Sequence, residues 1–157
     1  MSLCLDCGLC CDGTMFEVAE IAPEEAARLE GKVRLSADRT KLLQGCSALQ
    51  PDCKCGVYTE RPQTCRRYKC FVLASLEEGK FTRAEADEAI REVLGRREKV
   101  AALVGEKDVH RAVQLARAQS AAGTASEEVS DALRRLRQAL LLMQLQPADS
   151  IFKNFKE

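Results

Sequence analysis

Residues 55–70 read CGVYTERPQTCRRYKC, and the 157-residue chain is organised around this stretch. It contains three cysteines separated by two short Arg-containing runs. The N-terminus supplies a second cysteine-rich stretch, CLDCGLCC at residues 4–11, and Cys46 and Cys53 lie between the two. All nine cysteines therefore fall within residues 4–70, and the rest of the chain has none. We infer that the chemistry of the protein lies in the first half of the chain.

The composition favours helices. The chain has no tryptophan and only 4% aromatic residues, so its core must rely on Leu, Val, Ala and Ile, which suit packed helices. The second half is rich in Ala, Leu, Glu and Arg, which are strong helix formers. We therefore expect a mainly α fold. An irregular cysteine-rich metal-binding lobe with few short strands would cover residues 1–79, and a C-terminal helical bundle would cover residues 80–157.

Charge and hydropathy exclude several classes of protein. The 24 Lys and Arg residues balance the 24 Asp and Glu residues, which argues against a broad nucleic-acid surface. No run of 18 apolar residues is long enough to span a membrane, and the N-terminus lacks the basic and apolar regions of a secretory signal. We therefore expect a cytoplasmic protein with no membrane partner. In a reducing compartment, closely spaced cysteines more often bind metal than form disulfides.

Breakers and apolar positions predict the elements of the first half. Residues 14–21 are expected to form a short strand, and Pro23 opens a short helix to Leu29. Residues 46–64 are expected to be irregular, and a helix is expected from about residue 64 to 78. Cys65 and Cys70 would then lie about 140° apart around that helix. Either the helix starts after Cys65, or the two cysteines serve different sites.

Three helices are expected in the second half. The first covers residues 83–104 behind a capping box at Thr82 and Glu85, and the second covers residues 107–121. The third follows a capping box at Thr124 and Glu127 and ends before Pro147. Its apolar residues repeat at spacings of 4, 3, 4 and 3, which is typical of a packing seam: Val129, Leu133, Leu136, Leu140 and Met143.

The third helix is apolar nearly all round near its end, at Leu140, Leu141, Leu142 and Leu145. Such a helix is central in a bundle or lies in an interface. A homodimer or another protein partner bound through these helices therefore stays open. The following residues 151–157 are expected to form a short amphipathic turn with Phe152 and Phe155.

The spacing of the first cysteines indicates a metal site. Cys4, Cys7 and Cys10 match the first three cysteines of the ferredoxin loops that hold a cubane iron–sulfur cluster. Cys65 or Cys70 would then supply a fourth ligand. Cys4 and Cys7 alone would serve equally well as half of a zinc knuckle. The spacing therefore predicts a metal without choosing between zinc and a cluster of the 4Fe-4S type.

Cys10 and Cys11 are adjacent, and adjacent side chains diverge in most backbone conformations. We therefore expect two neighbouring sites, one on each cysteine. Each four-thiolate site is negatively charged, and Arg61 and Arg66 stand beside the ligands, where they could donate hydrogen bonds to sulfur or to neighbouring carbonyls. We take these two arginines as cofactor-binding candidates. No catalytic set is evident, so enzymatic activity is left open.

The pattern of cysteines resembles the bacterial and archaeal cysteine-cluster family called YkgJ-like, whose members are described as zinc- or iron-chelating proteins. The resemblance covers residues 4–70 and includes Tyr58, Arg61 and Pro62. It implies eight metal ligands: Cys4, Cys7, Cys10, Cys11, Cys46, Cys55, Cys65 and Cys70. Cys53 has no place in the pattern. A related pattern in flagellin lysine methylases is associated with an iron–sulfur cluster, and this resemblance slightly favours iron over zinc.

The sequence thus predicts a cytosolic protein that holds zinc or an iron–sulfur cluster through cysteine thiolates, in a redox, metal-handling or structural role. One alternative is a cluster-dependent protein-modifying enzyme of the methylase or oxidoreductase kind. Another is a zinc-stabilised protein-interaction module.

Overall fold

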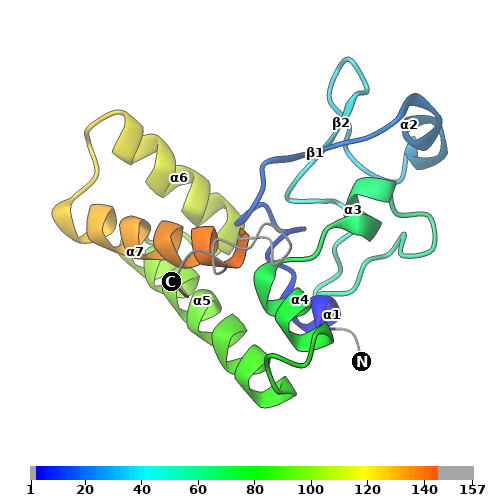
Figure 1. Ribbon diagram of the computed structural model, residues 1–157. Coiled ribbons are helices and arrows are strands. Elements are labelled where there is room, and N and C mark those ends of the chain that lie inside the picture. The colour runs from blue at the N-terminus through cyan, green and yellow to red at the C-terminus, as the bar shows by residue number, and fades with distance from the viewer. Residues whose placement is uncertain (1–2, 145–157) are drawn as a thin grey trace, which may run out of the picture. The chain divides into compact units, whose positions relative to one another are not determined.

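The computed structural model describes residues 3–144, and these residues form a mainly α protein. They contain seven helices and two short strands, and 54% of them are helical, which confirms the expected fold class. The chain divides into two compact units, Met1–Tyr68 and Lys69–Glu157 (Figure 1). Across the described part of the chain, each helix is too short or too polar to cross a membrane.

The first unit is built from short elements joined by long loops. Its strands β1 (Val18–Glu20) and β2 (Lys41–Leu43) pair antiparallel, with Val18 opposite Leu43. Three small helices complete it: α1 (Cys4–Cys7), α2 (Pro23–Leu29) and α3 (Gln63–Arg67). The strand expected over residues 14–21 is therefore observed as the shorter β1.

The core of the first unit includes a small cluster around Ile21, Ala26 and Leu42. Cys46 and Cys65 are among the half-buried residues that pack against this cluster. Leu9, Met15 and Leu29 of this unit are buried as well. Small domains commonly need a metal or a cross-link in addition to such a core. The cysteines are thus part of the packing of this unit.

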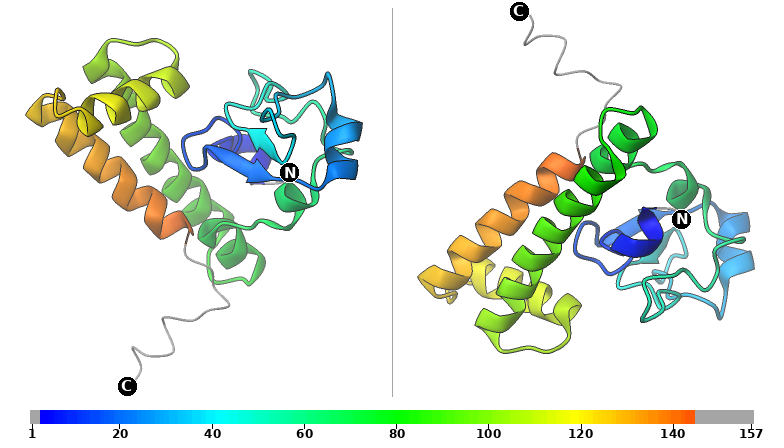
Figure 2. Two further views of the ribbon diagram at one scale, coloured as in Figure 1. Left: turned by 90° about the horizontal axis from the view of Figure 1, so that it is seen from above. Right: turned by 90° about the horizontal axis from the view of Figure 1, so that it is seen from below.

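The second unit consists of longer helices: α4 (Phe71–Glu77), α5 (Arg83–Val104), α6 (Val109–Ala121) and α7 (Glu127–Gln144). Helix α5 packs against both α6 and α7, and α4 packs against α5 and α7; Figure 2 shows α7 lying alongside α5. The buried side of α7 follows the expected seam, except that Leu133 is only half-buried: Val129, Ala132, Leu136, Ala139, Leu140 and Met143.

The expected capping box at the start of α5 is confirmed. The backbone N–H of Thr82 donates to Glu85 Oε2 over 2.7 Å, and the N–H of Glu85 donates to Thr82 Oγ1 over 3.3 Å. The helix runs without interruption through Gly95 and ends at Gly105, whose φ of 71° is the left-handed conformation that glycine adopts readily.

The prediction of one continuous helix over residues 64–78 is wrong. The chain leaves the helical conformation at Tyr68, which is extended, and begins a new helix at Phe71. Cys70 caps this new helix because its Sγ accepts a hydrogen bond from the N–H of Leu73 over 3.5 Å. Cys65 and Cys70 therefore do not share a helix, because Cys65 lies within α3 and Cys70 is the N-cap of α4.

The second capping box, predicted at Thr124 and Glu127, is also wrong. Ser126 Oγ accepts the hydrogen bond from the N–H of Val129, and α7 begins directly after this serine. Thr124 Oγ1 donates instead to the carbonyl of Gln119 at the end of α6. The amphipathic turn expected over residues 151–157 lies outside the described residues.

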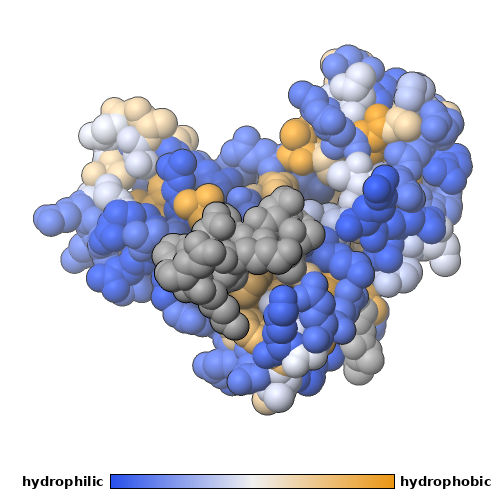
Figure 3. Space-filling view, in the orientation of Figure 1, coloured by the Kyte–Doolittle hydropathy of each residue, from blue (hydrophilic) through white to orange (hydrophobic). Residues whose placement is uncertain are grey.

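Most of the surface is hydrophilic, as the face drawn in Figure 3 shows. Two leucines at the end of α7 depart from this pattern, since Leu141 is 54% exposed and Leu142 is 63% exposed. The end of α7 is therefore apolar on its solvent side as well as on its buried side.

Candidate metal centre

All nine cysteines are thiols in this structure, and all but Cys70 belong to the first unit. The eight thiols of that unit come from three segments of the chain: residues 4–11, residues 46–55 and α3. The folding of each segment decides which thiols lie together.

The first segment is a turn of helix followed by a tight reversal. Helix α1 ends at Gly8, whose φ of 70° is left-handed. The carbonyl of Gly8 accepts hydrogen bonds from the N–H groups of Cys11 and Asp12, each over 2.9 Å. Gly8 also lies against Cys53, because a Cβ placed on this glycine would be 3.4 Å from Cys53 Sγ. Cys53, which has no place in the cysteine pattern, therefore packs beside the first cysteine segment.

The second segment doubles back on itself. Leu49 and Cys55 form an isolated antiparallel bridge, and the N–H of Gly56 donates to the carbonyl of Ala48 over 2.7 Å. A Cβ on Gly56 would come within 3.3 Å of that carbonyl oxygen, so glycine suits this close approach. The N–H of Cys46 donates to the carbonyl of Cys11 over 2.7 Å and ties the second segment to the first.

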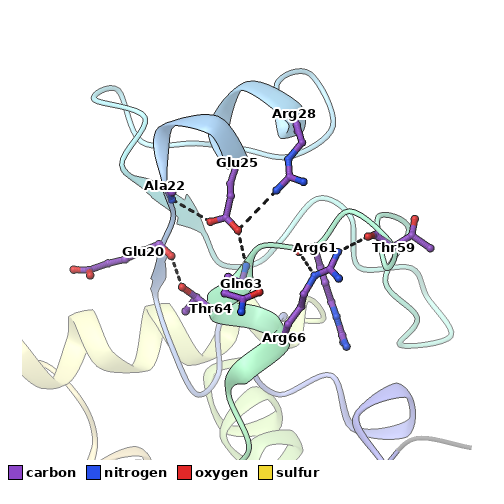
Figure 4. Close-up of polar contacts among 9 residues, drawn as sticks. All are labelled: Glu20, Ala22, Glu25, Arg28, Thr59, Arg61, Gln63, Thr64 and Arg66. Atoms are coloured by element: carbon purple, nitrogen blue, oxygen red, sulfur yellow. Dashed lines mark hydrogen bonds and ion pairs between the residues drawn. The ribbon is translucent and has the colours of Figure 1, made fainter.

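The third segment, α3, is held in place by polar contacts drawn in Figure 4. The carboxylate of Glu25 accepts hydrogen bonds from the N–H of Gln63 over 2.7 Å and from the N–H of Ala22 over 3.1 Å. Thr64 Oγ1 donates to the carbonyl of Glu20 over 2.6 Å. Glu25 is only 8% exposed, so these bonds are shielded from water. Together these contacts position Cys65. The sequence placed Glu25 in the first turn behind Pro23 but gave no sign that its carboxylate would hold α3.

The two candidate arginines use their side chains differently. Arg66 Nε donates to the carbonyl of Arg61 over 2.8 Å, and its Nη2 donates to the carbonyl of Thr59. Arg66 thus holds the loop before α3 through carbonyls. The guanidinium of Arg61 lies over the ring of Tyr58, with Cζ 4.0 Å from the ring centroid. Its positive charge opposes the rise in the pKa of Cys65.

Four thiols of the first unit influence one another strongly. Burial raises the pKa of Cys11 to about 12, and repulsion from Cys65, Cys46, Cys55 and Cys4 adds to the rise. Burial likewise raises the pKa of Cys65 to about 11, with further repulsion from Cys46 and Cys55. Burial also raises the pKa of Cys46. Cys11, Cys46, Cys55 and Cys65, named here the four-thiol group, therefore lie near one another in one partly buried patch.

Cys10 has different neighbours from Cys11. Its thiol donates to Met15 Sδ over 3.8 Å, and the hydroxyl of Tyr68 donates to the same sulfur over 3.4 Å. The ring of Tyr68 in turn meets the ring of Phe16 edge to face at 4.9 Å. The two adjacent cysteines are thus surrounded by different groups.

Cys70 belongs to the second unit, where it caps α4. Burial raises the pKa of its thiol, while the hydrogen bonds from the N–H groups of Leu73 and Val72 act in the opposite direction. This capping role was missed by the sequence reasoning, because the predicted continuous helix placed Cys70 in a helix interior.

Within residues 3–144, no three His, Cys, Asp or Glu side chains are arranged so that they could hold a metal ion as they stand. The chemistry of the four-thiol group nevertheless fits a thiophilic ion. Thiolates are soft ligands for zinc and iron, and a bound cation would offset the burial and repulsion that raise the pKa of Cys11 and of Cys65.

Comparison of the sequence with known protein families agrees with metal binding by these cysteines. The family model CxxCxxCC, described as "Putative zinc- or iron-chelating domain", matches residues 3–91, more than half of the chain. The chain belongs to the CxxCxxCC family. This confirms the family suspected from the cysteine pattern, and its description supports a zinc- or iron-chelating function. The match covers all nine cysteines and continues through α4 into α5. Neither the curated proteins nor the solved structures include a significant match.

Proposed function

We propose that this CxxCxxCC protein binds zinc or an iron–sulfur cluster, with the four-thiol group as one complete four-thiolate site. The observation that carries this proposal is that three segments meet in one patch. The N–H of Cys46 donates to the carbonyl of Cys11, and Cys46 and Cys65 pack against the same apolar cluster. The electrostatic interactions of Cys11 and Cys65 with each other, with Cys46 and with Cys55 agree with this grouping. Burial raises the pKa of Cys11, Cys46 and Cys65, and a bound cation would favour the deprotonated form of each ligand.

Three of the remaining family cysteines would form a second site. Cys4, Cys7 and Cys10, which come from one segment of the first unit, would supply its ligands. The different surroundings of Cys10 and Cys11 support this division, since Cys10 contacts Met15 whereas Cys11 belongs to the four-thiol group. Cys53, which packs against Gly8, is a thiol close to the first segment but outside the family pattern.

Arg61 and Arg66 would support the metal site without binding the metal themselves. The charge of Arg61 favours the thiolate form of Cys65 and offsets part of the negative charge of a four-thiolate site. Arg66 would shape the loop through its bonds to carbonyls rather than touch sulfur.

The role of the site depends on the metal. An iron–sulfur cluster supplies one-electron redox chemistry, whereas zinc supplies a structural cross-link or a store of metal. Either role requires the cysteines to stay reduced, so we place the protein in a reducing compartment such as the cytoplasm.

The test is an absorption spectrum together with metal and sulfide analysis on one sample purified without oxygen. A brown protein with acid-labile sulfide establishes a cluster, and a colourless protein with about two zinc ions per chain establishes structural zinc. The Cys46→Ser variant should lose part of the bound metal, whereas the matched Cys53→Ser variant should retain all of it. A wild-type protein that retains neither metal after reconstitution contradicts the proposal.

A further inference from the structure

The helical unit carries an apolar groove of about 600 Å³ between α4, α5 and α7. The side chains that matter here are Phe71, Phe81, Val93, Leu141 and Leu142. The rings of Phe71 and Phe81 meet edge to face with their centroids 5.8 Å apart. The groove therefore offers an aromatic pair on one side and the last turn of α7 on the other.

The α7 side of the groove is exposed to water. Leu141 is 54% exposed and Leu142 is 63% exposed, although both are large apolar side chains. Adjacent exposed leucines that line a groove are the kind of apolar surface that marks a binding site. The groove is the size of a pocket that holds a small ligand or a few side chains.

The chain continues directly from this groove. Residues 145–157 read LQPADSIFKNFKE and follow the turn of α7 that carries Leu141 and Leu142. Pro147 disfavours continuation of the helix, and residues 145–150 can span up to about 20 Å when extended. That length allows the residues after Ser150 to reverse direction and return to the groove.

The composition of this segment matches the groove. Ile151, Phe152 and Phe155 have the spacing of one apolar face of a helical turn, with polar residues between them. The protein has only five phenylalanines, of which two line the groove and two lie in this segment. Aromatic side chains pair favourably with one another beyond the area that they bury.

We propose that residues 151–157 fold back onto their own chain and fill the groove, with Phe152 and Phe155 packed against Phe71, Phe81 and the exposed leucines of α7. The segment thereby covers the apolar end of α7 and makes the groove an intramolecular docking site. This inference concerns the helical unit and does not depend on the metal or on its ligands.

The absence of native tryptophan makes a direct test available. The Phe152→Trp variant of the full chain, loaded with zinc under reducing conditions, contains a single tryptophan. Docking predicts blue-shifted emission and acrylamide quenching several-fold weaker than that of a free tryptophan derivative. Adding Leu142→Lys should abolish this protection, because it places a charge in the groove at an exposed position. Adding Leu115→Lys, at a leucine of α6 that is 41% exposed and does not line the groove, should leave the protection intact.

The Phe155→Trp variant gives a second reporter in case the first substitution disturbs docking, and far-UV circular dichroism confirms that each variant is folded. The proposal is overturned if both tryptophans are quenched as fast as the free derivative. Protection that survives Leu142→Lys would place the segment elsewhere and also overturn it. Protection that grows with protein concentration would show that the segment docks on a second copy instead of on its own chain.

Discussion

At the scale of single residues, the thiols differ in what surrounds them. Cys65 belongs to the four-thiol group, whereas Cys53 lies outside the family pattern and packs against Gly8. We expect Cys65→Ser to weaken metal binding by more than the roughly 10–100-fold that follows loss of an outer hydrogen-bond partner of a ligand. Metal content after dialysis and the melting temperature measure this effect.

Cys53→Ser is the matched control for that comparison, and it should change neither quantity appreciably. Equal loss of metal and equal melting temperatures for the two variants would contradict the assignment of Cys65 as a ligand.

At the scale of elements, Glu25 joins α2 to α3. Its carboxylate accepts hydrogen bonds from the N–H of Gln63 and the N–H of Ala22, and these bonds hold its pKa below the ordinary value. Glu25→Gln should lower the free energy of unfolding at pH 7 by about 1.5–3 kcal/mol, the range for hydrogen bonds to charged groups. Glu24→Gln is the control, because Glu24 is exposed and lies in the same first turn.

The same carboxylate predicts a dependence on pH. A lowered pKa means that the ionised form is favoured by folding, so Glu25 stabilises the folded protein fully above its ordinary pKa of about 4.3. This contribution is lost as the pH falls through the lowered pKa. The difference in stability between wild type and Glu25→Gln should therefore shrink in acid, which urea unfolding at several pH values measures. A difference that stays constant down to pH values below the carboxyl range would show that the charge of Glu25 is not responsible.

Ser126 caps the N-terminus of α7. Ser126→Ala should cost about 0.5–2 kcal/mol of stability, since it leaves the N–H of Val129 without its side-chain acceptor. Thr124→Ala should cost less, because Thr124 bonds to the end of α6 and does not cap α7. Chemical denaturation of both variants tests this order, and a larger loss for Thr124→Ala would restore the capping box predicted from the sequence.

At the scale of the whole molecule, the two units differ in what stabilises them. The first has a small cluster of buried residues and most of the thiols, whereas the second has a long helical core that contains no candidate ligand beyond Cys70. Removal of metal by a chelator under reducing conditions should therefore unfold the first unit and leave α5–α7 folded. Hydrogen exchange should show lost protection in residues 18–67 and retained protection in α5–α7. Loss of protection throughout the chain would show that the helical unit also depends on the metal.

The pattern of the sequence was sufficient for much of the fold. Apolar spacing and glycine stops located α5, α6 and α7 to within a few residues, because these helices bury one side against each other and end at strong local signals. Pro23 marked α2 for the same reason. Capping was less predictable, since Ser126 and Thr124 are both good caps and the packing of α6 against α7 decides between them.

Composition and cysteine spacing were sufficient for the family, for the helical character of the second half and for the confinement of all nine cysteines to residues 4–70, because these are local properties of the sequence. Only the tertiary structure separated α3 from α4 and brought together Cys11, Cys46, Cys55 and Cys65 from three segments. The grouping of the thiols depends on contacts between residues far apart in the chain, such as the bond from Cys46 to Cys11 and those from Gln63 to Glu25. Spacing along the chain carries no information about such contacts, and burial and repulsion arise only when the chain has folded.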